Sequence, residues 1–301
     1  MTALQQEILR LKEEKNALIL AHYYQTMDIQ EVADIVGDSF ELAKRAQSTT
    51  KPIIVLAGVR FMAESAKILN PDKIVLLPAS DAGCLMADMI TPEDVRKMKA
   101  EHPQAAVMCY VNSTAETKTL CDICCTSSSA VKIAKSLPEE EILFVPDRNL
   151  GAYVAEQVPE KTFHFYRGFC PIHNVVRKEE VDAARKAHPR ALVLVHPECN
   201  KEVRDAADYV GSTAGIIRFV EESPLDEFII GTEIGVVERI NKLVVGKTAH
   251  LLSHHLTCSN MKKTTIEDIH HALIHMEEII ELDPEVMDQA RVTLERMVQV
   301  R

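Results

Sequence analysis

Short runs of consecutive apolar residues alternate with amphipathic stretches along the first part of the chain. Residues 17–21 form the first apolar run, and residues 3–16 before it repeat their apolar positions with helical periodicity. The elements predicted after them are helices over 28–36, 39–47 and 61–69 and strands over 52–57 and 73–77. Strands that alternate with helices at this spacing indicate βαβ units. The pattern therefore predicts an α/β fold in which helices cover both faces of a parallel sheet.

The same order of strands, helix starts and loops recurs three times, with landmark residues 86 or 88 positions apart. Four sets of residues keep this spacing: His22, Tyr110 and His196 at strand ends; Ser39, Ser127 and Thr213 at helix starts; Lys73, Lys161 and Lys247 before the third strands; and Cys84, Cys170 and Cys258 in loops. A fixed internal period indicates repeated structural units. We therefore predict three homologous three-layer αβα domains with parallel sheets, arranged around a pseudo-threefold axis.

The predicted domains cover residues 1–86, 87–172 and 173–261. Residues 262–301 follow them and are expected to form two helices, over 265–278 and 284–300, that pack back on the first repeat.

Closure of three equivalent units around an axis would bring their equivalent loops to one central place. The cysteines that would meet there are Cys84, Cys170 and Cys258. Three thiols are too few for a closed structural zinc site, but they suit a [4Fe–4S] cluster in which one iron is left open for substrate. Such an iron is a Lewis acid that can polarise a carbonyl or hydroxyl oxygen.

The same closure would gather helix N-termini and strand ends around the thiols. Helix N-termini bind anions through free backbone N–H groups and the positive end of the helix dipole. Those expected here carry Ser39, Ser127, Ser212 and Thr213. The strand ends carry side chains suited to proton transfer and to holding carboxylates, namely His22, Tyr24, Tyr110, Asn112, His196 and Glu198. We therefore expect a pocket for a small ligand with several negative charges.

Charge and composition narrow the class of partner. The chain of 301 residues has a formal net charge of −11, which disfavours sequence-independent binding to nucleic acid and binding to an anionic membrane. Nowhere does an uncharged apolar run approach the roughly 18 residues of a membrane span. We interpret the protein as cytoplasmic and its partners as small molecules. Its eight cysteines are then not expected to form a disulfide framework.

Several short motifs together resemble the quinolinate synthase family along nearly the whole chain. They are HYYQ (22–25), GDS (37–39), YVNS (110–113), CTSS (125–128), CPIH (170–173), HPEC (196–199), GTE (231–233) and MKK (261–263). The chain departs from the family pattern at Tyr23, where Asn is usual, at Phe169, where His is usual, and at Ser129, where Asn is usual. None of these departures removes a proposed ligand or catalytic group.

The resemblance implies an enzyme of NAD biosynthesis. Such an enzyme condenses iminosuccinate (iminoaspartate) with dihydroxyacetone phosphate and releases quinolinate, phosphate and two waters. It implies a [4Fe–4S] cluster on Cys84, Cys170 and Cys258, and a transient partner that supplies iminosuccinate, either L-aspartate oxidase or aspartate dehydrogenase. The residues expected to bind substrate are His22, Ser39, Tyr110, Val111, Asn112, Ser127, His173, His196, Pro197, Glu198, Ser212 and Thr213.

One mechanism fits both the residues and the resemblance. Glu198 is expected to move protons, while His22, Tyr24 and His196 polarise carbonyl or hydroxyl groups, and Tyr110 is the fifth residue expected to be catalytic. His173 lies three residues after Cys170, so a direct role and an indirect role through that cysteine are both open.

Other motifs leave alternatives open. Cys121 and Cys124 have the C-x-x-C spacing of metal sites, but no counterpart in the other units, so we interpret 121–125 as a helix–loop segment or a redox pair. The histidines interpreted as surface or loop residues are His102, His188, His254, His255, His270, His271 and His275, and the acidic run 139–141 is interpreted as a solvated face. A zinc hydrolase using His196 and Glu198, a non-catalytic iron–sulfur electron carrier and a repeat-built binding module are the alternative functions.

Overall fold

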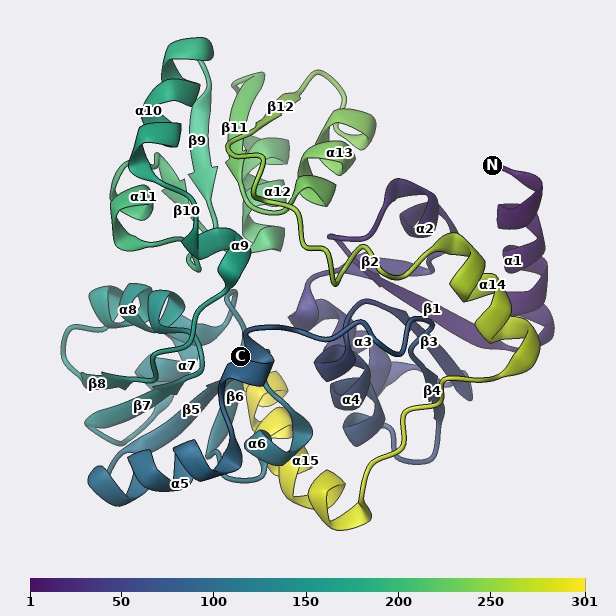
Figure 1. The fold of residues 1–301 in the computed structure, drawn as a ribbon, viewed down its shortest axis with the longest axis horizontal. Helices are drawn as coiled ribbons and strands as arrows, with labels where there is room; N and C mark the ends of the chain where they lie inside the picture. The colour runs from purple at the N-terminus through teal and green to yellow at the C-terminus, as the bar shows by residue number, and fades with distance from the viewer. Residues whose placement is uncertain (301) are drawn as a thin grey trace.

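Three parallel sheets of four strands form the framework of the computed structural model, which describes residues 1–300. Figure 1 shows them as three lobes around a common centre. The strands of the first sheet are β1 (Ala17–His22), β2 (Ile35–Gly37), β3 (Ile53–Ala57) and β4 (Ile74–Leu76). The helices beside it are α1 (Ala3–Glu14), α2 (Met27–Val32), α3 (Ser39–Ser48) and α4 (Arg60–Leu69).

The second lobe repeats this arrangement. Its strands are β5 (Ala106–Tyr110), β6 (Ile123–Cys125), β7 (Glu141–Val145) and β8 (Thr162–Phe165). Its helices are the short 3₁₀ helix η1 (Ala87–Met89), α5 (Pro92–Glu101), α6 (Ala115–Lys118), α7 (Ala130–Ser136) and α8 (Arg148–Gln157).

The third lobe follows the same order. Its strands are β9 (Leu192–Val195), β10 (Tyr209–Val210), β11 (Glu227–Gly231) and β12 (Thr248–Leu251). Its helices are α9 (Pro171–Asn174), α10 (Lys178–Ala187), α11 (Lys201–Asp205), α12 (Thr213–Glu222) and α13 (Ile234–Leu243). The strand orders β2-β1-β3-β4, β6-β5-β7-β8 and β10-β9-β11-β12 are identical. The predicted fold class, three αβα units with parallel sheets, is confirmed.

One strand in each unit was not expected from the sequence. The helix predicted over 28–36 is wrong, because α2 ends at Val32 and residues 35–37 form β2. Likewise, Cys124 and Cys125 lie in strand β6 and not in a helix–loop segment. The unexpected strands β2, β6 and β10 lie at the edge of each sheet and hold two or three residues. Runs this short carry no hydrophobic period, so the pattern of apolar positions does not reveal them.

An aspartate before each edge strand ties it to the central strand beside it. The backbone N–H of Ile19, Val107 and Val193 donates to Asp34, Asp122 and Asp208 respectively, at 2.8 Å in all three units. Each carboxylate also faces a cation, with Lys12 at 2.9 Å, Lys99 at 3.7 Å and Arg185 at 2.9 Å. The spacing of these aspartates matches the period of the sequence, so they are a further mark of the repeat.

Replacing Asp208 with alanine is expected to destabilise the third unit. The substitution leaves the N–H of Val193, a residue fully buried in β9, without its acceptor, and an unpaired buried donor costs about 1–3 kcal/mol. Urea unfolding measures the loss. Asp205→Ala is the matched control, because the Asp205 carboxylate is paired with exposed Lys201. Equal stability of the two variants would contradict this role of Asp208.

The predicted lysine landmarks also have a common structural role. Lys161 donates to the carbonyls of Leu137 and Glu139 at 2.7 and 2.6 Å, and Lys73 donates to the carbonyl of Thr49. Lys247 does the same toward Ser223 and Leu225 in the third unit. Each lysine therefore ties the start of its strand to the segment that leads into the neighbouring strand of the sheet.

The two C-terminal helices pack in different places. Helix α14 (Ile266–His275) lies against α1, and its Ile269 and Leu273 share one core with Ile8 and Leu11. Helix α15 (Pro284–Gln299) packs on β6 and α6 as well as on α4, between the first and second lobes (Figure 1). Helix α14 therefore covers the first unit, whereas the apolar face of α15 completes the core of the first and second units.

None of the helices within residues 1–300 combines the length and the apolar character needed to span a bilayer.

Candidate functional site

A cavity lies where the carboxyl ends of the three sheets meet. Most of the residues predicted for the site line it: His22, Tyr24, Ser39, Cys84, Tyr110, Asn112, Ser127, Cys170, His173, His196, Glu198, Thr213 and Cys258. Val111, Pro197 and Ser212 do not line it. The structure therefore brings together side chains from all three repeats.

The three loop cysteines follow the last strand of each sheet. Backbone N–H groups two or three residues further on point at each sulfur, from Met86 and Ala87 to Cys84, from His173 to Cys170, and from Asn260 and Met261 to Cys258. N–H groups aimed at sulfur stabilise thiolates, the form in which cysteine binds metal.

Burial raises the pKa of Cys84 to about 12, and it also raises the pKa of Cys170 and of Cys258. The charge of Cys258 adds to the rise at Cys84, and the charge of Cys84 adds to the rise at Cys170. Three thiols that line one cavity and that face backbone N–H groups fit a shared cationic centre. The residues present therefore fit an iron–sulfur cluster.

Two buried carboxyl groups that sequence reasoning missed hold these loops in place. Asp147 accepts the backbone N–H of Cys170 at 3.0 Å, and Glu233 accepts that of Cys258 at 3.2 Å. They are equivalent positions, 86 residues apart, so the period of the sequence could have found them. Burial, helped by the charge of Glu198, raises the pKa of Asp147 to about 8. Burial also raises the pKa of Glu233, against the opposing charge of Lys262.

Glu198 stands at the centre of a hydrogen-bond network. Its Oε1 accepts the hydroxyl of Tyr110 at 2.7 Å, and its Oε2 lies 2.8 Å from Nδ1 of His173. Burial would raise the pKa of Glu198, but His196 and His173 and the hydrogen bonds from His173 and Tyr110 lower it below the usual range of a glutamate. Glu198 is therefore a carboxylate at neutral pH.

His173 connects this carboxylate to the rest of the site. Its Nδ1 also lies 3.2 Å from the sulfur of Cys170, and its Nε2 lies 3.0 Å from Oγ1 of Thr232. The hydroxyl of Tyr24 continues the chain, 2.9 Å from Thr232 and 3.1 Å from Thr213. His173 therefore contacts both a proposed metal ligand and the proposed base.

His22 and His196 are held in one neutral tautomer. The Nδ1 of His22 accepts the backbone N–H of Tyr24, and the Nδ1 of His196 accepts that of Glu198, at 3.2 and 3.3 Å. Nε2 then carries the proton, and in His196 it lies 3.2 Å from Oγ of Ser127. Burial lowers the pKa of His196 to about 4, against the charge of Glu198. Burial and the charge of His196 lower the pKa of His22 to about 3. Both rings are neutral donors suited to polarising an oxygen.

This neutral state makes folding stability depend on pH. Between pH 6.5 and about 4, the unfolded chain binds a proton at His196 that the folded chain does not bind, so stability falls as the pH falls. We expect His196→Asn to reduce the slope of the unfolding free energy in this window by about 1.36 kcal/mol per pH unit. Urea unfolding of both proteins in the same cofactor state measures the slopes, and parallel curves would contradict the assignment.

The helix starts differ from one another. Asp38 caps α3 by accepting the N–H groups of Phe40 and Glu41, and Ser212 caps α12 by accepting that of Gly215. Ser127 lies in the turn before α7, which begins only at Ala130. The hydroxyls of Ser39, Ser127 and Thr213 still face the cavity.

The remaining cysteines lie away from the cavity. Cys109, Cys121, Cys124 and Cys125 are buried in the second unit, where the sulfur of Cys124 lies 3.2 Å from Oγ1 of Thr293 in α15. Cys199 is buried behind the strand end that carries His196. The C-x-x-C motif therefore does not belong to the site.

Comparison with known proteins assigns this arrangement to a family. A family model described as quinolinate synthetase A protein matches residues 6–299. The chain belongs to the quinolinate synthase family. It is 52% identical to the quinolinate synthase of Alkaliphilus metalliredigens, over 98% of this chain and 97% of that one. It is 50% identical to those of Clostridium perfringens and Caldicellulosiruptor bescii, over 97% and 99% of this chain and 97% and 98% of theirs.

Membership of the quinolinate synthase family makes the protein an enzyme of that kind and sets aside the hydrolase, electron-carrier and binding-module alternatives. The departures from the family pattern leave the cavity intact. The guanidinium carbon of Arg148 lies 4.6 Å from the centre of the Phe169 ring, and that of Arg239 lies 5.2 Å from the centre of the Tyr23 ring. Ser129 accepts the backbone N–H of Thr126 at 2.9 Å.

Proposed function

We propose that the central cavity condenses iminosuccinate with dihydroxyacetone phosphate to give quinolinate, phosphate and two waters, as a step of NAD biosynthesis. The observation that carries the proposal is the meeting of three thiols with the Tyr110–Glu198–His173 network in one cavity. The reaction needs proton transfers and the loss of oxygen-containing groups. The Tyr110–Glu198–His173 network would serve the proton transfers, and a metal centre on the three thiols would serve the loss of oxygen.

Cys84, Cys170 and Cys258 would hold a [4Fe–4S] cluster. When bound, the cluster supplies an iron with an open position, a Lewis acid for the oxygen that leaves as water. Asp147 and Glu233 orient the chain at Cys170 and Cys258 through their backbone amides. Hydrogen bonds of this kind around a metal site orient the ligands and adjust their electronic properties.

The substrates carry carboxylates and a phosphate, and the cavity offers donors from three elements. Ser39 and Thr213 line it from the starts of α3 and α12, Ser127 lines it from the turn before α7, and His196 lines it from the end of β9. Asn112 adds a buried side-chain oxygen without a protein partner, which can accept a hydrogen bond from an imine or a hydroxyl. These groups would fix the orientation of the substrates before reaction.

Glu198 would act as the general base and acid. It is ionised at neutral pH, and both of its oxygens already accept hydrogen bonds, from Tyr110 and from His173. These hydrogen bonds stabilise the carboxylate and fix the position of the side chain that would take up the proton. His22 and His196, neutral and protonated on Nε2, would donate hydrogen bonds to developing oxyanions.

An anaerobic assay tests the proposal. The cluster-loaded protein is expected to form quinolinate from iminosuccinate and dihydroxyacetone phosphate, with one phosphate released for each quinolinate. Since iminosuccinate is unstable in water, it is generated in the cuvette by L-aspartate oxidase or aspartate dehydrogenase, either of which we propose as a transient partner in the cytoplasm. Release of phosphate without quinolinate would contradict the proposed condensation.

A further inference from the structure

Two equivalent groups of side chains lie outside the central cavity. The second-unit cluster consists of His102, Glu141 and His164, and the third-unit cluster consists of His188, Glu227 and His250. Each pair of equivalent residues is 86 positions apart, the period of the repeat. Within each cluster, one donor atom from every residue lies within 4.8 Å of the others.

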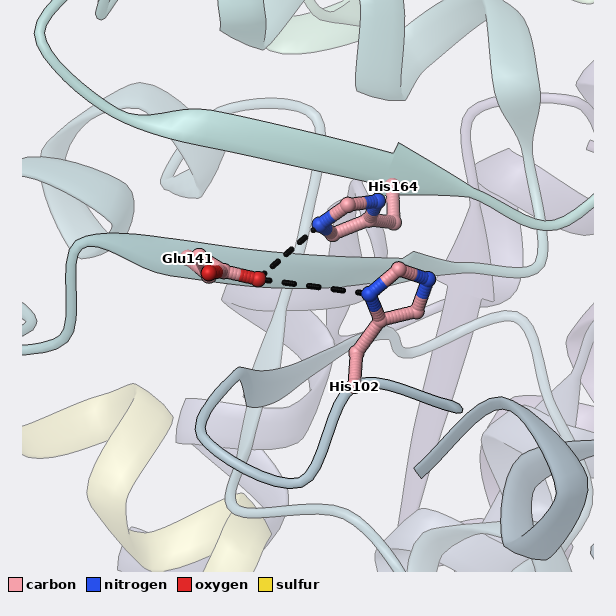
Figure 2. A group of neighbouring side chains, drawn as sticks. All are labelled: His102, Glu141 and His164. Atoms are coloured by element: carbon pink, nitrogen blue, oxygen red, sulfur yellow. Dashed lines mark hydrogen bonds and ion pairs between the residues drawn. The ribbon is translucent and has the colours of Figure 1, made fainter. Parts of the chain in front are cut away.

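The second-unit cluster joins a helix end to two strands. His102 follows the last residue of α5, Glu141 begins β7 and His164 lies in β8. Nε2 of His164 lies 3.1 Å from Oε2 of Glu141, and Nδ1 of His102 lies 4.0 Å from the same oxygen. The two imidazole rings stack at 3.6 Å, and Figure 2 shows one nitrogen of each turned toward the carboxylate.

The third-unit cluster has the same form, and its donor atoms lie closer together. Nδ1 of His188 and Nε2 of His250 both lie 3.1 Å from Oε1 of Glu227. The rings again stack at 3.6 Å. His102, His188 and Glu141 lie at the surface, as interpreted from the sequence, and the structure adds that they are partners in organised clusters.

Position and exposure separate both clusters from the catalytic cavity. Glu141 and Glu227 begin their strands, whereas the cavity lies at the carboxyl ends of the sheets. The side chains of both clusters are between 20% and 42% exposed. An ion can therefore reach the donor atoms from solvent, and water can complete its coordination.

The repeat does not need these clusters in order to fold. In the first unit the equivalents of Glu141 and His164 are Ile53 and Leu76, and Leu76 forms an antiparallel bridge with Ile279. The C-terminal segment thus covers in the first unit the edge that stays open in the other two. Only the units with an open edge carry the His–Glu–His set.

We propose that each His–Glu–His cluster binds one divalent cation of the zinc class. Two imidazole nitrogens and one carboxylate oxygen form a common zinc ligand set, and the fourth position belongs to water in a half-exposed site. The bound ion replaces the hydrogen bonds that each carboxylate now accepts. In the second unit it links the end of α5 to β7 and β8, and in the third unit it links the end of α10 to β11 and β12. Each ion thereby stabilises the open edge of its sheet, at the end opposite to the thiols.

One neighbouring charge distinguishes the two sites. Arg190 lies 3.7 Å from Oε2 of Glu227, whereas the equivalent residue in the second unit is the uncharged Gln104. A cation beside the carboxylate disfavours a second cation, so the second-unit cluster is the tighter site. Since Arg190 is 80% exposed, the effect is modest, and Arg190→Gln is expected to tighten the third-unit site about two- to fivefold.

Zinc uptake by the cluster-loaded full chain tests the proposal. After equilibrium dialysis against zinc, we expect about two zinc ions per chain beyond the iron content, one for each cluster. His164→Ala or His250→Ala should each remove one ion, and the double variant should remove both. Glu141→Gln keeps the size of the side chain but loses the charge, and it should weaken its site at least about tenfold, as loss of a ligand costs more than loss of an outer partner.

The control variant removes a different group of histidines. His254 and His255 are exposed, lie near Glu180 and have no repeat-equivalent cluster. Their double alanine variant should keep both zinc ions. The proposal is overturned if the wild type binds no zinc, or if the His164/His250 double variant binds as much as the wild type. It is also overturned if uptake is lost in the His254/His255 variant instead.

Discussion

Replacing Cys84, Cys170 or Cys258 with alanine is expected to abolish the brown colour and the activity of the anaerobically purified enzyme. Each of these thiols faces the central cavity, and backbone N–H groups point at each sulfur. A cluster left with two of three thiolate ligands loses much of its binding free energy. Iron and sulfide content should fall from about four of each per chain to near zero.

The matched control for this prediction is Cys121→Ala. Cys121 is also buried, but its thiol donates to the carbonyl of Thr117 and does not face the cavity. We expect this variant to keep its iron, its sulfide and its activity. Retention of the cluster in all three cavity variants, with loss in the Cys121 variant, would overturn the ligand assignment.

Replacing Glu198 with glutamine is expected to lower kcat about 10²- to 10⁴-fold, the range in which a positioned acid–base group contributes. The amide keeps the size of the side chain and one hydrogen-bond acceptor for Tyr110 or His173, but it takes up no proton. The absorbance of the cluster should remain, because the proposed ligands are unchanged. Single-turnover and steady-state assays together separate the loss in kcat from any change in KM.

Glu202→Gln on the exposed side of α11 is the control for this variant. It changes the same charge four residues away and should leave kcat unchanged. Undiminished turnover in the Glu198 variant would remove this carboxylate from the mechanism. Loss of the cluster would instead show that Glu198 supports Cys170 through His173.

The central parts of the fold could be predicted from the sequence because burial leaves a pattern. The strands β1 and β9 are apolar runs, and β1 ends in His22 and β9 ends just before His196, both of which line the cavity. The repeated spacing predicted that Cys84, Cys170 and Cys258 lie around one cavity, although none of them belongs to a local metal-binding motif. Long-range order could thus be inferred from periodicity.

The features that could not be predicted depend on contacts between distant segments and not on the pattern of apolar residues. The edge strands β2 and β10 are too short for a hydrophobic period, and the site of α15 depends on an open surface shared by two units. Asp147 looks like an ordinary loop residue until the amide of Cys170 is placed beside it. Val111 and Pro197 were expected to bind substrate through the family resemblance alone, and their side chains are not among those that line the cavity.

The central claim is that one thiol from each repeat holds a single cluster with one iron open to substrate. Mössbauer spectroscopy of the ⁵⁷Fe-loaded enzyme tests it most directly. We predict that adding a substrate or a dicarboxylate analogue changes the signal of one iron in about four and leaves the others unaltered. Four irons that respond alike, or none that responds, would contradict the account.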